Sequence, residues 1–180
     1  MKKILAVLIS LSLLAGAAFA QGETTIGVFW DTAATQTLRT AAGGFDVNHT
    51  AYIYCVDSEQ VVGGAAFMVV KDTRLTDIGE VFPAGIQIGD LYTGLQIGLT
   101  TPQIGYFGTP VWLGTITYWA GNMLLENAEI SIVAYPAEGA ILLSDHNGEL
   151  REVAGGTAYL TIPVDNDETS WGAVKNLYGN

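Results

Sequence analysis

The chain is poor in cysteine and in long apolar runs. Cys55 is the only cysteine in 180 residues, so no disulfide can form within one chain. The letters around it, TAYIYCV, are typical of a β-strand, and we expect a buried thiol that packs as a small apolar group, with a reactive or intermolecular thiol as the alternative. Beyond residue 20, no segment approaches the roughly 20 apolar residues of a membrane helix, so we predict no membrane insertion.

Basic residues are also scarce. Lys and Arg number seven against 18 Asp and Glu, which gives a net charge of −11. Lys2 and Lys3 lie in the N-terminal segment described next, so the rest of the chain has five basic residues and a net charge of −13. A surface this acidic repels the phosphates of nucleic acids and of anionic lipids, so we predict no nucleic-acid partner.

The first 20 residues, MKKILAVLISLSLLAGAAFA, have the composition of a secretory signal peptide. Lys2 and Lys3 precede an apolar run, and small residues end in an A-x-A cleavage site at Ala20. Gln21 stands where a lipid anchor needs a cysteine. We therefore expect cleavage near Ala20 and a secreted or periplasmic protein.

Helical periodicity is almost absent between residues 21 and 162. Short runs rich in Val, Ile, Thr, Tyr and Trp recur instead, separated by Gly, Pro, Asn and Asp. The predicted strands are 24–30, 49–56, 61–70, 85–89, 94–100, 111–119, 128–135, 140–144, 149–153 and 157–163. This spacing predicts an all-β fold, an antiparallel β-sandwich of about nine or ten strands over residues 21–163, of immunoglobulin-like or jelly-roll type. We interpret the charged segment 71–80 as a solvated loop.

The segment 164–180 differs from the rest. An acidic run leads into TSWGAVKNLYGN, in which apolar residues recur at helical spacing. We predict an acidic linker and a short C-terminal helix or tail, which covers an open end of the sandwich or docks on a partner. Asp165, Asn166 and Asp167 are the candidate calcium ligands, and no other cofactor is predicted.

The phrase G-[IL]-Q-I-G occurs twice in GIQIGDLYTGLQIG, residues 85–98. Antiparallel pairing of the two copies around a four-residue loop, 90–93, places Gln87 opposite Gln96. The isoleucines and the leucine of both copies then share the core face, and the glycines and glutamines form a flat outer face. This hairpin is the predicted contact surface, with Gln87, Gln96 and Tyr92 as candidate ligand-binding residues.

Tryptophan supplies a second set of candidate ligand-binding residues, Trp30, Trp112 and Trp119. Trp112 and Trp119 are seven positions apart on one predicted strand, so we expect them on opposite faces, with at least one outside. An exposed indole beside Gln87 and Gln96 would offer sugar rings both stacking and amide hydrogen bonds. The alternative places all four tryptophans in the core or at its rim.

Three strands carry a resemblance to a known family. HTAYIYCV, GGAAFMVV and GTITYWA resemble, in order and rhythm, the early and middle strands of cohesin-like and related carbohydrate-binding sandwiches over residues 24–135. The opening GVFWD and the closing W-G-x-x-K-x-L-Y also resemble short exported proteins of Gram-negative bacteria that have no assigned activity. The resemblance implies export and an immunoglobulin-like or cohesin-like sandwich, and it leaves the function open.

Patterns of catalytic residues are missing. His49 and His146 do not occur in a metal-ligand spacing, and no phosphate-binding loop is found. We predict a non-enzymatic structural or interaction protein of the cell envelope or extracellular space, which binds a protein partner or a second copy of itself through a sheet face or edge. The alternative is a carbohydrate-binding module that uses exposed Trp, Tyr and Gln side chains.

Overall fold

The structure, a computed structural model, describes residues 23–41, 48–105, 109–120 and 125–162. These ranges contain thirteen strands and no helix, which confirms the predicted all-β fold. The strands are β1 (Thr25–Phe29), β2 (Leu38–Thr40), β3 (Asn48–Val56), β4 (Val61–Lys71), β5 (Thr76–Val81), β6 (Gly85–Asp90), β7 (Gly94–Ile104), β8 (Val111–Trp119), β9 (Leu125–Val133), β10 (Leu142–Ser144), β11 (Leu150–Glu152), β12 (Ala154–Gly155) and β13 (Thr157–Ile162). The predicted C-terminal helix lies outside the described residues.

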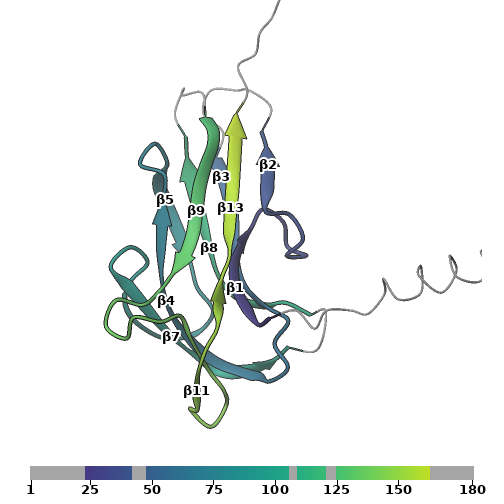
Figure 1. The fold of residues 1–180 in the computed structure, drawn as a ribbon, viewed down its shortest axis with the longest axis vertical. Helices are drawn as coiled ribbons and strands as arrows, with labels where there is room; N and C mark the ends of the chain where they lie inside the picture. Colours follow the sequence, from purple (N-terminus) through teal and green to yellow (C-terminus); the bar gives the residue numbers. More distant parts are fainter. Residues whose placement is uncertain (1–22, 42–47, 106–108, 121–124, 163–180) are drawn as a thin grey trace, which may run out of the picture.

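Two sheets form the sandwich. The first has the order β12-β1-β3-β8-β5. The second has the order β11-β10-β4-β9-β13-β2, with β7 on the other edge of β4 and β6 beyond β7. Figure 1 shows β9 and β13 running side by side in front of β3 and β8.

The sheets are mixed, which corrects the prediction of an entirely antiparallel sandwich. β1 pairs in parallel with β12, and β13 pairs in parallel with β2. Each parallel pair joins an N-terminal strand to a strand near residue 160, so it closes the domain between distant parts of the chain. Local turn signals identify hairpins between successive strands, and they carry no information about such closures.

The core lies between the inner faces of the two sheets. Ile26, Ile53 and Ile116 project into it from the first sheet, and Phe67 and Ile130 from the second, all fully buried. Val, Ile and Leu alternate with outward residues on these strands because successive side chains of a strand point to opposite faces.

Cys55 is fully buried in this core, as the sequence predicts. Burial among apolar side chains raises the pKa of the thiol to about 11.

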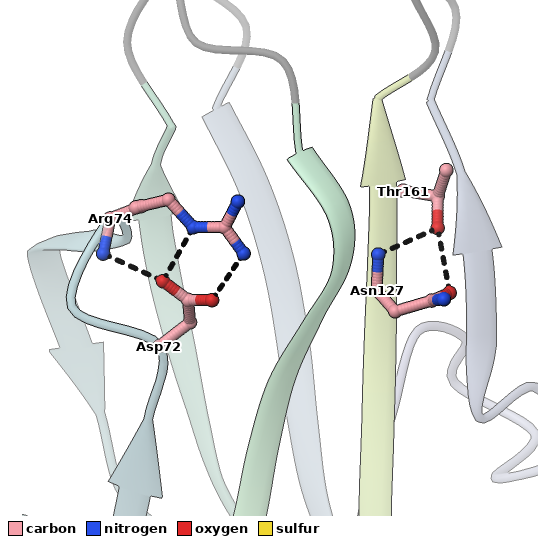
Figure 2. A network of polar contacts seen from close by, with 4 residues as sticks. All are labelled: Asp72, Arg74, Asn127 and Thr161. Atoms are coloured by element: carbon pink, nitrogen blue, oxygen red, sulfur yellow. Dashed lines mark hydrogen bonds and ion pairs between the residues drawn. The ribbon is translucent and has the colours of Figure 1, made fainter.

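Strand β5 corrects the interpretation of residues 71–80 as a charged loop. Only the first part is a turn, in which Asp72 Oδ1 accepts hydrogen bonds from the backbone N–H and the Nε of Arg74 at 2.8 and 2.9 Å (Figure 2). Asp77 and Glu80 then lie in a strand that pairs with β8 alone among the described strands. Charged side chains are common on edge strands, where they discourage pairing with another chain.

One predicted turn and one irregularity that the sequence does not predict can be compared with the structure. The DHNG turn is confirmed, because Asp145 connects β10 to β11 and its Oδ1 accepts from the N–H of Asn147 and of Glu149 at 2.7 and 2.9 Å. A bulge that the sequence does not predict occurs within β9, where the register with β13 shifts. There the Asn127 N–H donates to Thr161 Oγ1 at 3.3 Å (Figure 2).

The repeat GIQIG…GLQIG forms the predicted hairpin, from β6 and β7, but its register is one residue away from the predicted one. Gln87 lies opposite Ile97 and not opposite Gln96. A shift of one residue turns every side chain of one strand to the other face. Ile97 therefore stays in the core, while Ile86 and Ile88 face outward and are 70% and 58% exposed.

The loop between the two strands decides this register. Asp90 Oδ1 accepts hydrogen bonds from the N–H of Tyr92 and of Thr93 at 2.8 and 2.9 Å, which closes a loop of three residues. Leu91 is fully buried, and its carbonyl accepts from the Val69 N–H at 2.7 Å. The repeated phrase fits either register, so burial of Leu91 and its bond to β4 select the observed one.

Gly89 and Gly98 of the hairpin have different surroundings, and replacing each of them tests this geometry. Gly89 has φ +86°, and a Cβ there would lie 2.1 Å from the Gly94 carbonyl oxygen, whereas a Cβ on Gly98 meets nothing closer than Ile86 Cβ at 3.9 Å. We expect Gly89→Ala to lower the free energy of unfolding by at least ~1–2 kcal/mol, from the left-handed backbone alone. Gly98→Ala should change it by less than ~0.5 kcal/mol. Equal urea midpoints for the two variants would contradict the observed register.

Candidate functional site

Exposed apolar side chains gather on the outer face of β6, β7, β4, β10 and β11. Cross-strand neighbours form two rows across these five strands. One row is Ile88, Gln96, Ala66, Leu142 and Glu152, and the other is Ile86, Gly98, Gly64, Ser144 and Leu150. Both rows have large side chains near their ends and small ones in the middle, so the face is hollowed.

The hollow is an open groove of about 380 Å³. Ile86 and Ile88 line one side, and Leu142 and Leu150 line the other. Its lining is mostly apolar, and Glu138 is its one ionisable side chain. Exposed apolar surface that is grouped in this way marks interaction sites more often than single exposed apolar residues do.

Gly64 and Gly98, the two glycines in the middle of one row, differ in whether the backbone around them requires glycine. A Cβ on Gly64 would lie 2.4 Å from the Ile97 carbonyl oxygen, so the close approach of β7 to β4 requires glycine there. A Cβ on Gly98 would point into open space beside Ile86. Gly98 is therefore free to be replaced without a clash, although it helps to keep the groove deep.

The hairpin that carries one wall of the groove is tied to both sheets. Leu91 anchors it to β4, and Tyr92 anchors it to β5, because the Tyr92 hydroxyl donates to Asp77 Oδ2 at 2.8 Å. The Lys71 ammonium lies 5.4 Å from the centroid of the Tyr92 ring. Tyr92, a predicted contact residue, is thus half-buried and joined to two charged neighbours of its own chain.

Two carboxyl groups of β5 share the inner side of this edge strand. Asp77 lies opposite Tyr118, and Glu80 lies opposite Ile116, and both of those β8 residues face the core. Partial desolvation of Glu80, together with a hydrogen bond and the negative charge of Asp77, raises the pKa of Glu80 to about 7. The link between the hairpin and β5 therefore contains a group that titrates near neutral pH.

The structure does not bring the predicted ligand-binding residues together. Gln96 lies on the floor of the groove, while Gln87 projects from the opposite side of β6. Trp30 is only 5% exposed, and its Nε1 donates to the Tyr159 carbonyl at 2.9 Å. Trp30 is a core residue because Ile26, Val28 and Trp30 alternate inward along and just beyond β1, so it is no part of a surface.

Trp112 and Trp119 lie on the same outer face of β8, which corrects the prediction from their seven-residue spacing. Ile53 of β3 lies opposite Gly114, and the next residue of β3 lies opposite Trp112, so β8 has one extra residue, Leu113. This bulge reverses the alternation of faces beyond it. The prediction that at least one of the pair lies outside is confirmed by Trp119, which is 39% exposed.

Other aromatic residues share this outer face of the first sheet. The rings of Tyr52 and Tyr54 stack with centroids 6.2 Å apart, and Tyr54 lies opposite Trp112. Trp112 is half-buried, and its Nε1 donates to Thr115 Oγ1 at 3.0 Å. The aromatic side chains of this face are therefore largely buried or half-buried, apart from Trp119.

The described residues cover only part of the chain to which the metal and membrane predictions apply. Asp165, Asn166 and Asp167, the candidate calcium ligands, lie outside the described residues. Within the described ranges no group of three or more His, Cys, Asp and Glu side chains is placed to hold a metal ion. In the same ranges no helix is long and apolar enough to cross a membrane.

The groove walls were not predicted from the sequence. Ile86 and Ile88 are apolar, and the assumed register assigned them to the core. Leu91 is the signal that identifies the other register, since a leucine in a short loop between two strands indicates that the loop itself is buried. Leu142 and Leu150 come together with them only through the pairing of β10 with β4.

Comparison with known proteins gives structural relatives alone. No protein-family profile and no curated protein sequence matches the chain. Among solved structures, a chain of the CaDoc0917–CaCohA2 complex is similar with a TM-score of 0.51 and 12% identity, over 77% of this chain and 99% of the other. CaCohA2 is from Clostridium acetobutylicum.

A second relative is a type III cohesin module from the ScaE cell-surface anchoring scaffoldin of Ruminococcus flavefaciens. Its TM-score is 0.52 at 10% identity, over 81% of this chain and 96% of the module. The chain has a cohesin-like fold. This confirms the resemblance that the strands HTAYIYCV, GGAAFMVV and GTITYWA indicate.

The raised pKa of Glu80 predicts how stability depends on pH. Its folded-state value of about 7 exceeds the ordinary value of 4.5, so the folded chain holds this proton more tightly than the unfolded chain does. The resulting stabilisation is present below pH 4.5 and is lost as the pH rises through 7. We expect wild type and Glu80→Gln to have similar urea midpoints at pH 5, and wild type to have the lower midpoint at pH 8.

The matched control is Glu126→Gln, which removes a carboxylate from an exposed position of β9. A gap between wild type and Glu80→Gln that does not change between pH 5 and pH 8 would contradict the raised pKa.

Proposed function

We propose that the chain is an exported, non-enzymatic module that binds a protein partner in the groove between the β6–β7 hairpin and the β10–β11 hairpin. The observation that carries this proposal is the groove itself, with its apolar walls open to solvent and its floor of small residues. Export follows from the signal-peptide pattern of residues 1–20.

The groove suits a segment with apolar side chains flanked by Lys or Arg. Ile86, Ile88 and Leu150 are more than half exposed, and burying them against a partner is favourable by about 25 cal/mol per Å² of apolar surface. Glu138 lies in the lining, Glu152 ends one of the rows, and the whole chain is strongly acidic. Such a surface favours basic residues at the rim of the partner.

The structural relatives support a binding role of this kind. CaCohA2 occurs in a complex with CaDoc0917, and the type III cohesin belongs to a scaffoldin that anchors to the cell surface. The first of these relatives occurs bound to another protein, and this chain shares the fold of both. We infer that it likewise recognises a protein and catalyses no reaction.

Filling the groove floor tests the proposal. Gly98→Leu adds a side chain where the nearest atom to the new Cβ is 3.9 Å away, so it should block the groove and leave the fold intact. Gly79→Leu adds the same side chain on β5, in the other sheet, where nothing lies within 4 Å, and it is the matched control. Each protein is immobilised and exposed to the envelope and extracellular proteins of the source organism, and bound proteins are quantified by mass spectrometry.

We expect a protein that is retained equally by wild type and Gly79→Leu and at least tenfold less by Gly98→Leu, which is about 1.4 kcal/mol of binding free energy. If no retained protein distinguishes the two leucine variants, the groove is not the binding site. Urea midpoints of both variants close to that of wild type establish that any loss comes from the groove.

Carbohydrate binding is the second candidate function, and one observation favours it. The bulge of β8 brings Trp112 and Trp119 to one outer face, together with Tyr52 and Tyr54. Aromatic rings on a sheet face offer stacking to sugar rings. This face belongs to the first sheet, so it is separate from the groove on the second sheet.

Tryptophan fluorescence tests this second function. A polysaccharide that binds the aromatic face should change the emission of the wild-type protein, and Trp119→Ala should weaken that binding because Trp119 is the more exposed indole of the pair. Gly98→Leu should leave it unchanged. An unaltered spectrum across a panel of soluble and insoluble polysaccharides would exclude the aromatic face as a sugar site.

A further inference from the structure

β6 is an edge strand without the usual protection. All six of its residues are exposed, and among the described strands it pairs with β7 alone. An antiparallel neighbour on one side uses only half of the backbone N–H and C=O groups of a strand. The other half of β6 points away from the sheet and is available to a further strand.

The remaining sheet edges in the described part of the chain are short or charged. β12 has two residues. β2 and β11 have three residues each and contain Arg39 and Arg151. β5 is as long as β6 but carries Asp77 and Glu80. Length, charge and inward-pointing carboxylates are the devices that keep edge strands from pairing between chains.

β6 has none of these devices over most of its length. From Gly85 to Gly89 it has no charged side chain and no proline, and its two isoleucines are exposed. The chain has a net charge of −11, but a second copy that approaches this edge meets no carboxylate between Gly85 and Gly89, and Asp90 is the first one. The absence of charge along this edge therefore favours its pairing with the same strand of another copy.

We propose that β6 pairs antiparallel with β6 of a second copy of the chain. The second sheets of the two copies then join across a two-fold axis at Gln87. This pairing is independent of the partner proposed for the groove. With the axis at Gln87, Ile86 lies opposite Ile88 of the second copy, and residues that lie opposite each other in a sheet share a face. Gln87 then lies opposite Gln87 of the second copy, and Asp90 lies opposite Ala84.

This register agrees with the charges and the apolar surface. The four isoleucines of the two copies form one apolar strip on the outer face, and the two Asp90 carboxylates lie at opposite ends of the paired strands. A contact made by one short strand from each copy buries less than the ~1,200 Å² of a stable interface. We therefore expect a concentration-dependent dimer, strengthened by salt because salt screens the repulsion between two acidic chains.

The self-opposed position of Gln87 provides the test. Gln87→Lys and Gln87→Glu each place two like charges opposite one another across the axis, whereas a mixture of the two variants places opposite charges there. Sedimentation velocity of wild type, of each variant and of the 1:1 mixture is measured up to ~1 mM, a concentration that detects even weak association. We expect wild type and the mixture to form dimers and each variant alone to remain monomeric.

Several results would overturn the pairing. They are a wild-type protein that stays monomeric throughout, variants that dimerise as wild type does, or a mixture that associates no more than its components. Gln87 is exposed and projects away from the groove, so both variants should keep the wild-type urea midpoint and any groove partner. Gly98→Leu should block the groove partner and keep the dimer, so failure of one proposal is distinguishable from failure of the other.

Discussion

The pairing of β4 with three strands is the constraint on which the rest of the structure depends. One edge of β4 pairs with β7, and the other pairs with β10 at residues 64–66 and then with β9 at residues 68–71. This arrangement extends the second sheet beyond the sandwich, as far as β6 on one side and β11 on the other. Gly64 is required because the β7 backbone approaches so closely, so this position between the two apolar walls carries no side chain.

The hairpin of β6 and β7 connects the two proposed surfaces. Its outer face forms one wall of the groove, and its free edge is the proposed site of pairing with a second copy. Two anchors hold it in place, the buried Leu91 with its bond to Val69 and the hydrogen bond from Tyr92 to Asp77. Glu80 lies on the same side of β5 as Asp77, so the second anchor lies beside a group that changes charge near neutral pH.

The outer faces of the two sheets differ in chemistry, and this separates the candidate functions. The face of the second sheet is aliphatic and hollowed, which suits the side chains of a protein. The face of the first sheet is aromatic, with Trp112 and Trp119 on one side of β8, which suits stacking against the faces of sugar rings. A single substitution on either face, such as one at Gly98 or Trp119, therefore affects one candidate and leaves the other.

The sequence by itself determined most of the strands, because alternation of apolar and polar residues depends only on the local backbone. The short strands β2 and β12 and the charged edge strand β5 were not predicted. It predicts β8 residue for residue, the turn at Asp145, the burial of Cys55 and the cohesin-like arrangement. The composition of the β6–β7 hairpin also predicted a contact surface there. The structure places Trp30 in the core, ties Tyr92 to Asp77 and turns Gln87 away from the groove.

Only the tertiary structure decided which way the side chains of β6 and of Trp112 face. A one-residue shift of register or one extra residue in a bulge reverses a face without changing the local pattern. Burial of Leu91 selects the first, and the pairing of β3 with β8 sets the second. The parallel closures of β1 with β12 and of β13 with β2 join strands far apart in the chain, so their partners are set by packing of the whole domain.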